Sequence, residues 1–369
     1  MAIHFADVHL GTELYGLCDP ETGINTRVLD FLESMDILVN TAKKEQVGLV
    51  LFAGDAFKSR TPNPTHVYQF ALRIKELASV APVVMVVGNH DYVGYGRISP
   101  IKIFGKMSDN VHVLDDVASY VDFSGVRVVA LPWLPGIRKC DVVEIANMLN
   151  NVLDSTPEDY VRILLTHCSI EGAACGSEHI VMFGRDTTYP LELFDGFDYV
   201  AAGHIHKHQS LRIGNTCIVY PGSLERLDFG EEQDSKGFVL VDIKRGGCAW
   251  DFVDVDAVPL ITLKVDKWPM RHKDIKNVAG AIVRVVIRGG VNVSTEELAE
   301  TLTKAGVYNI ASIMSETYHS SRTIRLDNER TEELDTLDLL RLYFENVGLS
   351  ESRIKILLEC AGRIVSNEL

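Results

Sequence analysis

Seven side chains that can bind metal ions stand directly after five short apolar runs of the chain. They are Asp7, His9, Asp55, Asn89, His167, His204 and His206. Asp7 and His9 are spaced i and i+2, which points both side chains the same way in an extended chain, and the last two histidines repeat that spacing. Open α/β sheets bind their ligands beyond the carboxyl ends of the strands. We therefore expect the seven side chains at one edge of one sheet.

The mixture of ligand types indicates which metals such a site would bind. Carboxylate, imidazole and amide groups without a thiolate favour manganese, iron or zinc over calcium. Two ions need a shared ligand, and Asp55 is the candidate because a carboxylate can give one oxygen to each ion. Pairs of ions about 3.5–4 Å apart stabilise both the attacking and the leaving oxygen during in-line displacement at phosphorus. The residues therefore predict a two-metal phosphoesterase.

Short strands and helices must position these ligands. The apolar runs that precede them are 2–6, 49–53, 83–87, 163–166 and 199–202. Their apolar residues are continuous rather than alternating, which is typical of strands that are covered on both faces. Helical patterns at 28–44 and 64–79 separate the first three runs. This alternation predicts an α/β sheet domain, to which we assign residues 1–255.

Two smaller parts are expected after this domain. Apolar runs at 261–265, 281–287, 308–314 and 323–326, with a helix that Ser294 and Glu297 would cap, predict a small α/β module at 256–328. Residues 329–369 carry two apolar helical stripes, separated by Gly348, and predict a helical hairpin.

The amino-acid composition excludes few classes of function, but it indicates the cellular compartment of the protein. The chain has 51 Asp+Glu against 36 Lys+Arg, a net charge of -15, which argues against a protein that coats nucleic acid through its overall field. A nuclease is not excluded, because carboxylates around metal ions count as negative only until the ions bind. The 7 Cys form no C-x-x-C pair, as in reduced intracellular proteins. No apolar run approaches a bilayer span of about 20 residues, and Asp7 interrupts the first one, so we expect an intracellular, cytoplasmic protein without membrane contact.

The ligand motifs also carry a family resemblance. D-V-H, G-D, G-N-H-D, T-H and G-H-I-H, in this order, resemble the calcineurin-like metallophosphoesterases. Within these, A-G-D-A-F, A-A-G-H-I-H and Y-P-G-S-L-E-R-L-D-F-G-E-E resemble the SbcD-type (meiotic-recombination-eleven type) nucleases of DNA double-strand-break repair. The resemblance covers the chain to about residue 243 and extends more loosely into the small module. It implies a four-layer α/β sandwich with a small DNA-capping α/β domain and a C-terminal helical hairpin.

The resemblance also implies roles for single residues. One ion would be held by Asp7, His9, Asp55 and His206, and the other by Asp55, Asn89, His167 and His204. His90 would contact the scissile phosphate and protonate the leaving oxygen, with Asp91 orienting it. Lys58 departs from the family, which places His or Asp after G-D-A-F. A lysine can hold a phosphate as a point charge but cannot copy imidazole geometry.

Four cations are candidates for contact with a DNA backbone: Lys58, Arg226, Lys267 and Arg271. The last two belong to a basic stretch at 264–276, for which a solvated charged loop is the alternative interpretation. Arg226 could make either a phosphate contact or a structural one. The resemblance implies that the C-terminal helices dock on an SbcC-type coiled-coil ATPase, although packing on the body of the protein is the alternative. It also implies a homodimer, for which 64–79 and 98–107 are the candidate segments.

The leading hypothesis is a manganese-dependent DNA nuclease, exonuclease and endonuclease, that acts in double-strand-break repair and recombination with an ATPase partner. The alternative enzyme would hydrolyse small phosphodiesters or monoesters with the same metals, but it leaves the small module and the helical tail without a role. A third hypothesis is a scaffold without activity, and the complete ligand set argues against it.

Overall fold

The computed structural model describes residues 1–94, 97–174, 176, 187–270, 275–316, 336–346 and 351–365. The chain forms two compact units, Met1–Met314 and Ser315–Leu369. Arg271 and the expected strand at 323–326 lie outside the described residues. The expected domain limits at 255 and 328 stay predictions.

Two six-stranded sheets form the centre of the first unit. The first sheet has the order β14-β13-β1-β2-β3-β4. Its strands are β1 (Ala2–Phe5), β2 (Leu49–Phe52), β3 (Val83–Val86), β4 (Val111–Leu114), β13 (Gly237–Lys244) and β14 (Gly247–Asp254). The strands β1 to β4 run parallel, so their carboxyl ends lie along the same edge of the sheet.

The second sheet has the order β11-β12-β10-β7-β6-β5. Its strands are β5 (Tyr120–Phe123), β6 (Val126–Leu131), β7 (Val161–His167), β10 (Tyr199–Gly203), β11 (Gln209–Ile213) and β12 (Thr216–Tyr220). The four strands β6, β7, β10 and β12 are parallel to their neighbours in this group. A further pair, β8 (Ser169–Ile170) and β9 (Thr188–Tyr189), follows β7.

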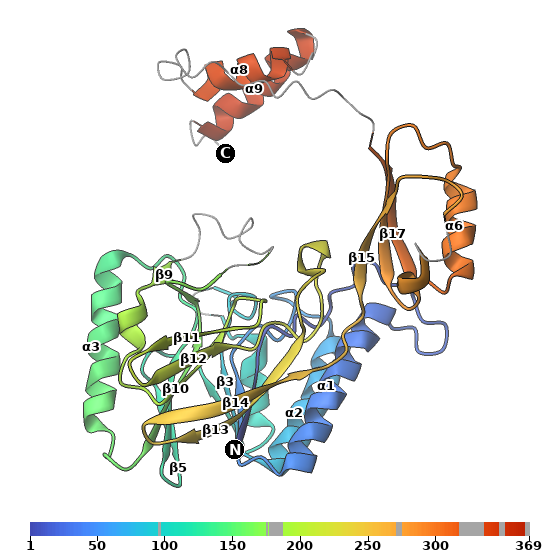
Figure 1. The fold of residues 1–369 in the computed structure, drawn as a ribbon. Helices are drawn as coiled ribbons and strands as arrows, with labels where there is room; N and C mark the ends of the chain where they lie inside the picture. The colour runs from blue at the N-terminus through green and yellow to red at the C-terminus, as the bar shows by residue number, and fades with distance from the viewer. Residues whose placement is uncertain are drawn as a thin grey trace. The chain divides into compact units, whose positions relative to one another are not determined.

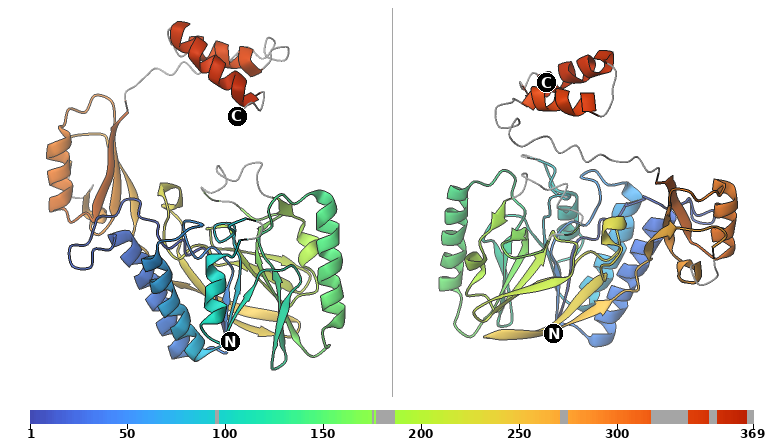
Figure 2. Two further views of the ribbon diagram at one scale, coloured as in Figure 1. Left: turned by 180° about the vertical axis from the view of Figure 1, so that it is seen from behind. Right: turned by 45° about the horizontal axis from the view of Figure 1, so that its top comes forward.

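Helices cover the outer face of each sheet. The first is covered by α1 (Thr26–Glu45), α2 (Pro64–Val80) and η1 (Pro100–Lys106), and the second by α3 (Lys139–Ser155) and η2 (Leu191–Phe194). Figure 1 and, from behind, Figure 2 show α3 on one side of the two sheets and α1 with α2 on the other. The predicted four-layer α/β sandwich is confirmed.

Side-chain alternation along the strands explains the layers. In β2, Val50 and Phe52 pack in the core under α1 and α2, whereas Leu49 and Leu51 pack against the second sheet. Successive strand residues point to opposite faces. All four side chains are buried, which is why this run is apolar at every position.

A small α/β module follows the two sheets. It consists of β15 (Leu260–Val265), η4 (Lys276–Val278), β16 (Ile282–Ile287), α6 (Thr295–Lys304) and β17 (Asn309–Ser315). The expected cap is present, because the Ser294 Oγ accepts a hydrogen bond from the Glu297 backbone N–H at 3.1 Å. Leu298 and Leu302 of α6 are buried against the sheet β15-β16-β17.

The small module contacts the larger body through the turn η3 (Phe229–Glu231). Phe229 packs in one apolar cluster with Leu260 and Ile282 of the module. Next to it, the Glu232 carboxylate accepts hydrogen bonds from the backbone N–H and the Oγ1 of Thr262, at 2.9 and 2.7 Å. The turn is therefore anchored to β15 by both apolar and polar contacts.

The second unit contains the helices α8 (Thr336–Asn346) and α9 (Glu351–Val365), which pack on each other. They confirm the predicted helical hairpin, although Gly348 of its turn lies outside the described residues. Ile354 of α9 is buried. In the described parts of the chain, no helix combines the length and the apolar character that crossing a bilayer requires.

Candidate metal centre

The seven expected ligands come from the carboxyl ends of five strands in two sheets. The first sheet supplies Asp7, His9, Asp55 and Asn89, and the second supplies His167, His204 and His206. The expectation of a single sheet was therefore wrong. The two sheets face each other, so parallel strands of both end at the same side of the sandwich and their ligands meet there.

The two sheets approach each other closely at this edge. Both Asp7 carboxylate oxygens accept a hydrogen bond from the His204 backbone N–H, at 3.1 and 3.0 Å. A Cβ atom at Gly203 would lie 2.1 Å from the Ala53 carbonyl oxygen, so only glycine fits between the sheets there. The ends of β1, β2 and β10 are thereby held in contact.

Several of the ligands have strained backbone. The φ angles are +50° at Asp7, +46° at His9, +60° at Asp55 and +98° at His204. Each such residue costs about 1–3 kcal/mol and persists only where its surroundings enforce it. Strain at four of seven candidate ligands is typical of a functional site.

The first group of ligand atoms surrounds His9. The Nε2 of His9 lies 3.1 Å from the Nε2 of His206. It also lies 4.0 Å from an oxygen of Asp7 and 3.6 Å from Oδ2 of Asp55. These four residues are the set that the resemblance assigned to one ion, and we call them the first half of the centre.

The second group surrounds His167. Its Nε2 lies 3.0 Å from Oδ1 of Asn89, 3.2 Å from Nδ1 of His204 and 3.5 Å from Oδ2 of Asp55. His204 Nδ1 and Asn89 Oδ1 are also 3.0 Å apart. These four residues are the second half of the centre. The two halves share Asp55, whose Oδ2 lies 3.6 Å from His9 Nε2 and 3.5 Å from His167 Nε2.

The spacing of these atoms fits divalent ions. A metal with bonds of about 2.1 Å holds neighbouring ligand atoms about 3.0–3.4 Å apart, the spacing found between the nitrogen atoms. Burial and the neighbouring charge of Asp55 raise the pKa of Asp7 to about 7, and a cation beside this carboxylate would favour its charged form. Burial lowers the pKa of His9 well below its ordinary value, which keeps the imidazole neutral, as a metal ligand must be.

Partners outside the two groups orient the histidine rings. The His167 Nδ1–H donates to the carbonyl oxygen of Ala53 at 2.6 Å. The His206 Nδ1–H donates to the buried carboxylate of Glu231 at 2.9 Å. Each bond leaves Nε2 to face the ligand cluster. Sequence reasoning missed Glu231, although the residue stands in the Y-P-G-S motif that carries the resemblance.

His90 and Asp91 differ from expectation in their contacts. The His90 Nδ1–H donates to the Lys58 carbonyl oxygen at 2.9 Å, so this carbonyl orients the ring. The Asp91 carboxylate instead accepts the backbone N–H groups of Asp55 and Gly88, at 2.8 and 3.1 Å. The expected orientation of His90 by Asp91 was therefore wrong, because backbone donors use both oxygens of the buried Asp91. Asp91 holds the loop that presents Asp55.

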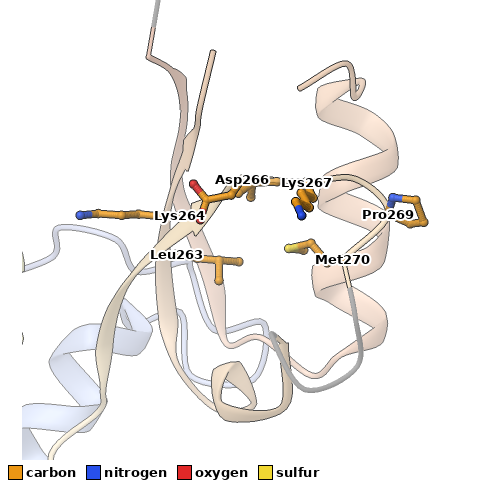
Figure 3. A pocket seen from close by; sticks show the side chains of 7 residues that line it. Leu263, Lys264, Asp266, Lys267, Pro269 and Met270 are labelled. Atoms are coloured by element: carbon orange, nitrogen blue, oxygen red, sulfur yellow. The ribbon is translucent and has the colours of Figure 1, made fainter. Parts of the chain in front are cut away.

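The expected substrate-binding cations have mixed outcomes. Arg226 donates to the backbone carbonyls of Ala257 and Asp234, at 2.8 and 2.9 Å, so its contacts are structural rather than directed at a phosphate. Lys58 and Lys267 are exposed. Figure 3 shows Lys267 beside a hollow of the small module and Lys264 pointing away from it. The fourth candidate, Arg271, is not among the described residues.

Comparison with known proteins places these features in a family. The DNA double-strand break repair protein Mre11 of Methanopyrus kandleri is 27% identical over 325 residues, covering 82% of this chain and 68% of that protein. SbcD, a component of the SbcCD nuclease of Staphylococcus epidermidis, is 28% identical over 262 residues, covering 66% of each protein. The chain thus spans about two thirds of the length of these relatives.

A dimetal phosphatase structure from Danio rerio is similar with a TM-score of 0.41 and 13% identity, covering 68% of this chain and 97% of that chain. The calcineurin-like phosphoesterase family matches residues 2–208, more than half of the chain. The predicted resemblance is confirmed, and the chain belongs to the calcineurin-like phosphoesterases.

Proposed function

We propose that this phosphoesterase is a manganese-dependent DNA nuclease that acts inside the cell, on chromosomal DNA, in double-strand-break repair. The observation that carries the proposal is the pair of ligand groups that share Asp55 at the edge of both sheets. The relatives named as a break-repair protein and a nuclease component support DNA as the substrate.

Asp55 and Asp91 have different proposed roles in phosphodiester hydrolysis. Two divalent ions, when bound, polarise the phosphoryl oxygens and supply an activated water. Asp55 keeps the two halves of the centre in register, because its Oδ2 is nearly equidistant from His9 and His167. Asp91 holds the Asp55 backbone and so limits movement of this bridge.

His90 is the residue that we assign to proton transfer. His90, His9 and Asp55 offer atoms within 4.8 Å of one another, so the His90 ring borders the cluster. The Lys58 carbonyl fixes Nδ1 as the protonated nitrogen of the neutral ring, and Nε2, when it carries a proton, donates it to the leaving oxygen. The exposed Lys58 side chain, on the same loop, would hold a neighbouring phosphate as a point charge.

The protein is also proposed to form a homodimer through α2 and η1. Tyr68 and Leu72, one helical turn apart, are 62% and 38% exposed, and Ile103 and Met107 are 53% and 46% exposed. Apolar side chains gathered on two adjacent elements favour a protein partner over water. Tyr68→Glu with Ile103→Glu should convert a dimer to a monomer in light scattering, and an unchanged mass would place the interface elsewhere.

The helical hairpin is proposed to dock on an SbcC-type ATPase. Tyr343 of α8 and Ile356 of α9 are 57% and 61% exposed, so each helix presents apolar surface. Removing the residues after Glu329 should abolish co-purification with the ATPase and leave manganese binding intact. Co-purification that survives the deletion would contradict this docking site.

The function is tested by incubating the protein and manganese with linear duplex DNA, a DNA hairpin and a small aryl phosphodiester. DNA cleavage that His90→Ala abolishes, with both ions still bound, is the expected result. Turnover of the small diester alone would contradict the nuclease and favour a phosphoesterase of small substrates. Bound ions without any turnover would favour a scaffold.

A further inference from the structure

A buried ion pair stands directly behind one of the proposed metal ligands. The Glu231 carboxylate accepts from His206 Nδ1–H at 2.9 Å through Oε1. Its Oε2 lies 2.8 Å from Lys236 Nζ and accepts from the Leu227 backbone N–H at 2.9 Å. Both oxygens therefore have partners. Glu231 and Lys236 are 1% and 0% exposed.

The lysine of this pair also holds the backbone of the same ligand. Lys236 Nζ donates to the carbonyl oxygen of His206 at 3.0 Å and to Ser223 Oγ at 2.9 Å. With Glu231, these bonds use the three donors of the ammonium group. The ring and the backbone of His206 are thus held by the two members of one ion pair.

A role in stability alone explains this arrangement poorly. Removing two charges from water is costly, and apolar residues of similar volume often stabilise a protein as well or better. A carboxylate behind a ligating imidazole, in contrast, selects the tautomer, fixes the ring and raises the basicity of the ligating nitrogen. His206 presents that nitrogen, Nε2, to the first half of the centre.

We propose that Glu231, held by Lys236, is a positioning residue that prepares His206 to bind the ion of the first half. This inference rests on the proposed metal centre. It assigns to Glu231 an effect on one of the two ions, because the ligand that the pair holds, His206, belongs to the first half.

The neighbouring residue provides a matched control. Glu232 stands on the same turn, but its carboxylate contacts Thr262 of the small module rather than a proposed metal ligand. Glu231→Gln and Glu232→Gln make the same chemical change one residue apart. Glu231→Gln leaves the Lys236 ammonium buried without its carboxylate partner, which can prevent folding. The double variant Glu231→Gln, Lys236→Met removes both charges and is used if the single variant does not fold.

The experiment titrates the full chain with manganese alone and records binding by calorimetry and electron paramagnetic resonance. We expect two ions in the wild type. In Glu231→Gln and in the double variant, the affinity for one ion should fall by about 10- to 100-fold while the other ion is retained. Glu232→Gln should match the wild type.

A second measurement reports the ligand itself without the metal. Nitrogen chemical shifts of the metal-free protein should show His206 with its proton on Nδ1 in the wild type and a mixture of tautomers in Glu231→Gln. Unchanged affinity and an unchanged tautomer would overturn the proposal. A wild type that binds no manganese would overturn it together with the metal centre, whereas ion binding without DNA cleavage would contradict only the proposed nuclease.

Discussion

The two halves of the metal centre are supported in different ways. In the first half, His206 is backed by a full negative charge, the carboxylate of Glu231. In the second half, His167 is backed by a neutral group, the Ala53 carbonyl, at the shorter distance of 2.6 Å. Both histidines are held by a hydrogen bond from Nδ1–H, but His206 donates to a charged acceptor and His167 donates to a neutral one at the end of a strand.

This difference predicts unequal binding of two ions. A carboxylate partner makes the ligating nitrogen a stronger base, whereas a carbonyl mainly fixes the orientation of the ring. We therefore expect the first half to bind its ion more tightly than the second. The second half should depend more on steric fit around His167. Substitutions can test this contrast, beginning with the residue that both halves share.

Asp55→Asn should have the largest effect. Asp55 Oδ2 lies 3.6 Å from His9 Nε2 and 3.5 Å from His167 Nε2, so its charge serves both halves. Since bound ions supply several kcal/mol of transition-state stabilisation, we expect turnover to fall by about 10³-fold or more, with loss of both ions. Elemental analysis of the metal content and diester turnover measure this. Asp242→Asn, an exposed carboxylate on β13, is the control. Two ions retained in Asp55→Asn would show that the halves bind independently.

Removing one histidine from each half should separate the two ions. His206→Ala should lose the tightly bound ion of the first half, and His167→Ala should lose the weakly bound ion of the second half. Each variant should keep the ion of the other half, in which no ligand is changed. Loss of one ion should lower turnover by about 10²-fold, a smaller effect than loss of the bridge. Manganese titrations of both variants give the remaining affinity, with His112→Ala on β4 as the control. If His206→Ala retains the tighter ion, the contrast between the halves is reversed.

Gly54→Ala tests the steric support of the second half. A Cβ atom at Gly54 would lie 2.6 Å from His167 Nδ1, on backbone with φ +91°. Gly246 has nearly the same φ, +89°, but open space around it, so Gly246→Ala reproduces the backbone strain alone. We expect Gly54→Ala to lower the free energy of unfolding by about 1–3 kcal/mol more than Gly246→Ala, because of overpacking. Denaturant unfolding and manganese titration should show this loss together with selective weakening of the second ion.

Equal stability of the two glycine variants would mean that His167 moves aside at little cost. The hydrogen bond between His167 and the Ala53 carbonyl would then not hold the ring rigidly, and the second half would not depend on steric fit.

The sequence predicted which residues form the candidate metal centre, but it did not predict which sheet carries each of them or which side chains hold them in place. Apolar runs show that strands are covered on both faces, and polar residues at their ends meet wherever parallel strands share an edge. Local patterns do not state which strands pair, so the division of the ligands between two sheets was not predicted from spacing. The contact of Glu231 was missed, and the choice between a phosphate contact and a structural one was left open for Arg226, because these contacts join residues that only the tertiary fold brings together.

Lys58→Ala should have the smallest effect on activity. It tests the proposed contact between DNA and a side chain that lies near His9 of the first half. Burial is the main cause of the lowered pKa of His9, and the charge of Lys58 is close enough to add to it. The substitution removes this charge but keeps the backbone carbonyl that orients His90. We expect proton transfer to be unaffected and one DNA phosphate contact to be lost, with a several-fold weaker affinity for duplex DNA.

Salt dependence distinguishes this loss from general damage. The slope of log affinity against log salt concentration should become shallower by about 0.9, the change for one phosphate, while turnover of the small diester stays at the wild-type level. Lys44→Ala, an exposed lysine on α1, should leave the slope unchanged. An unaltered slope in Lys58→Ala would mean that this lysine is a solvated loop cation that does not contact DNA. The two halves would then differ only in the groups that hold their histidine ligands.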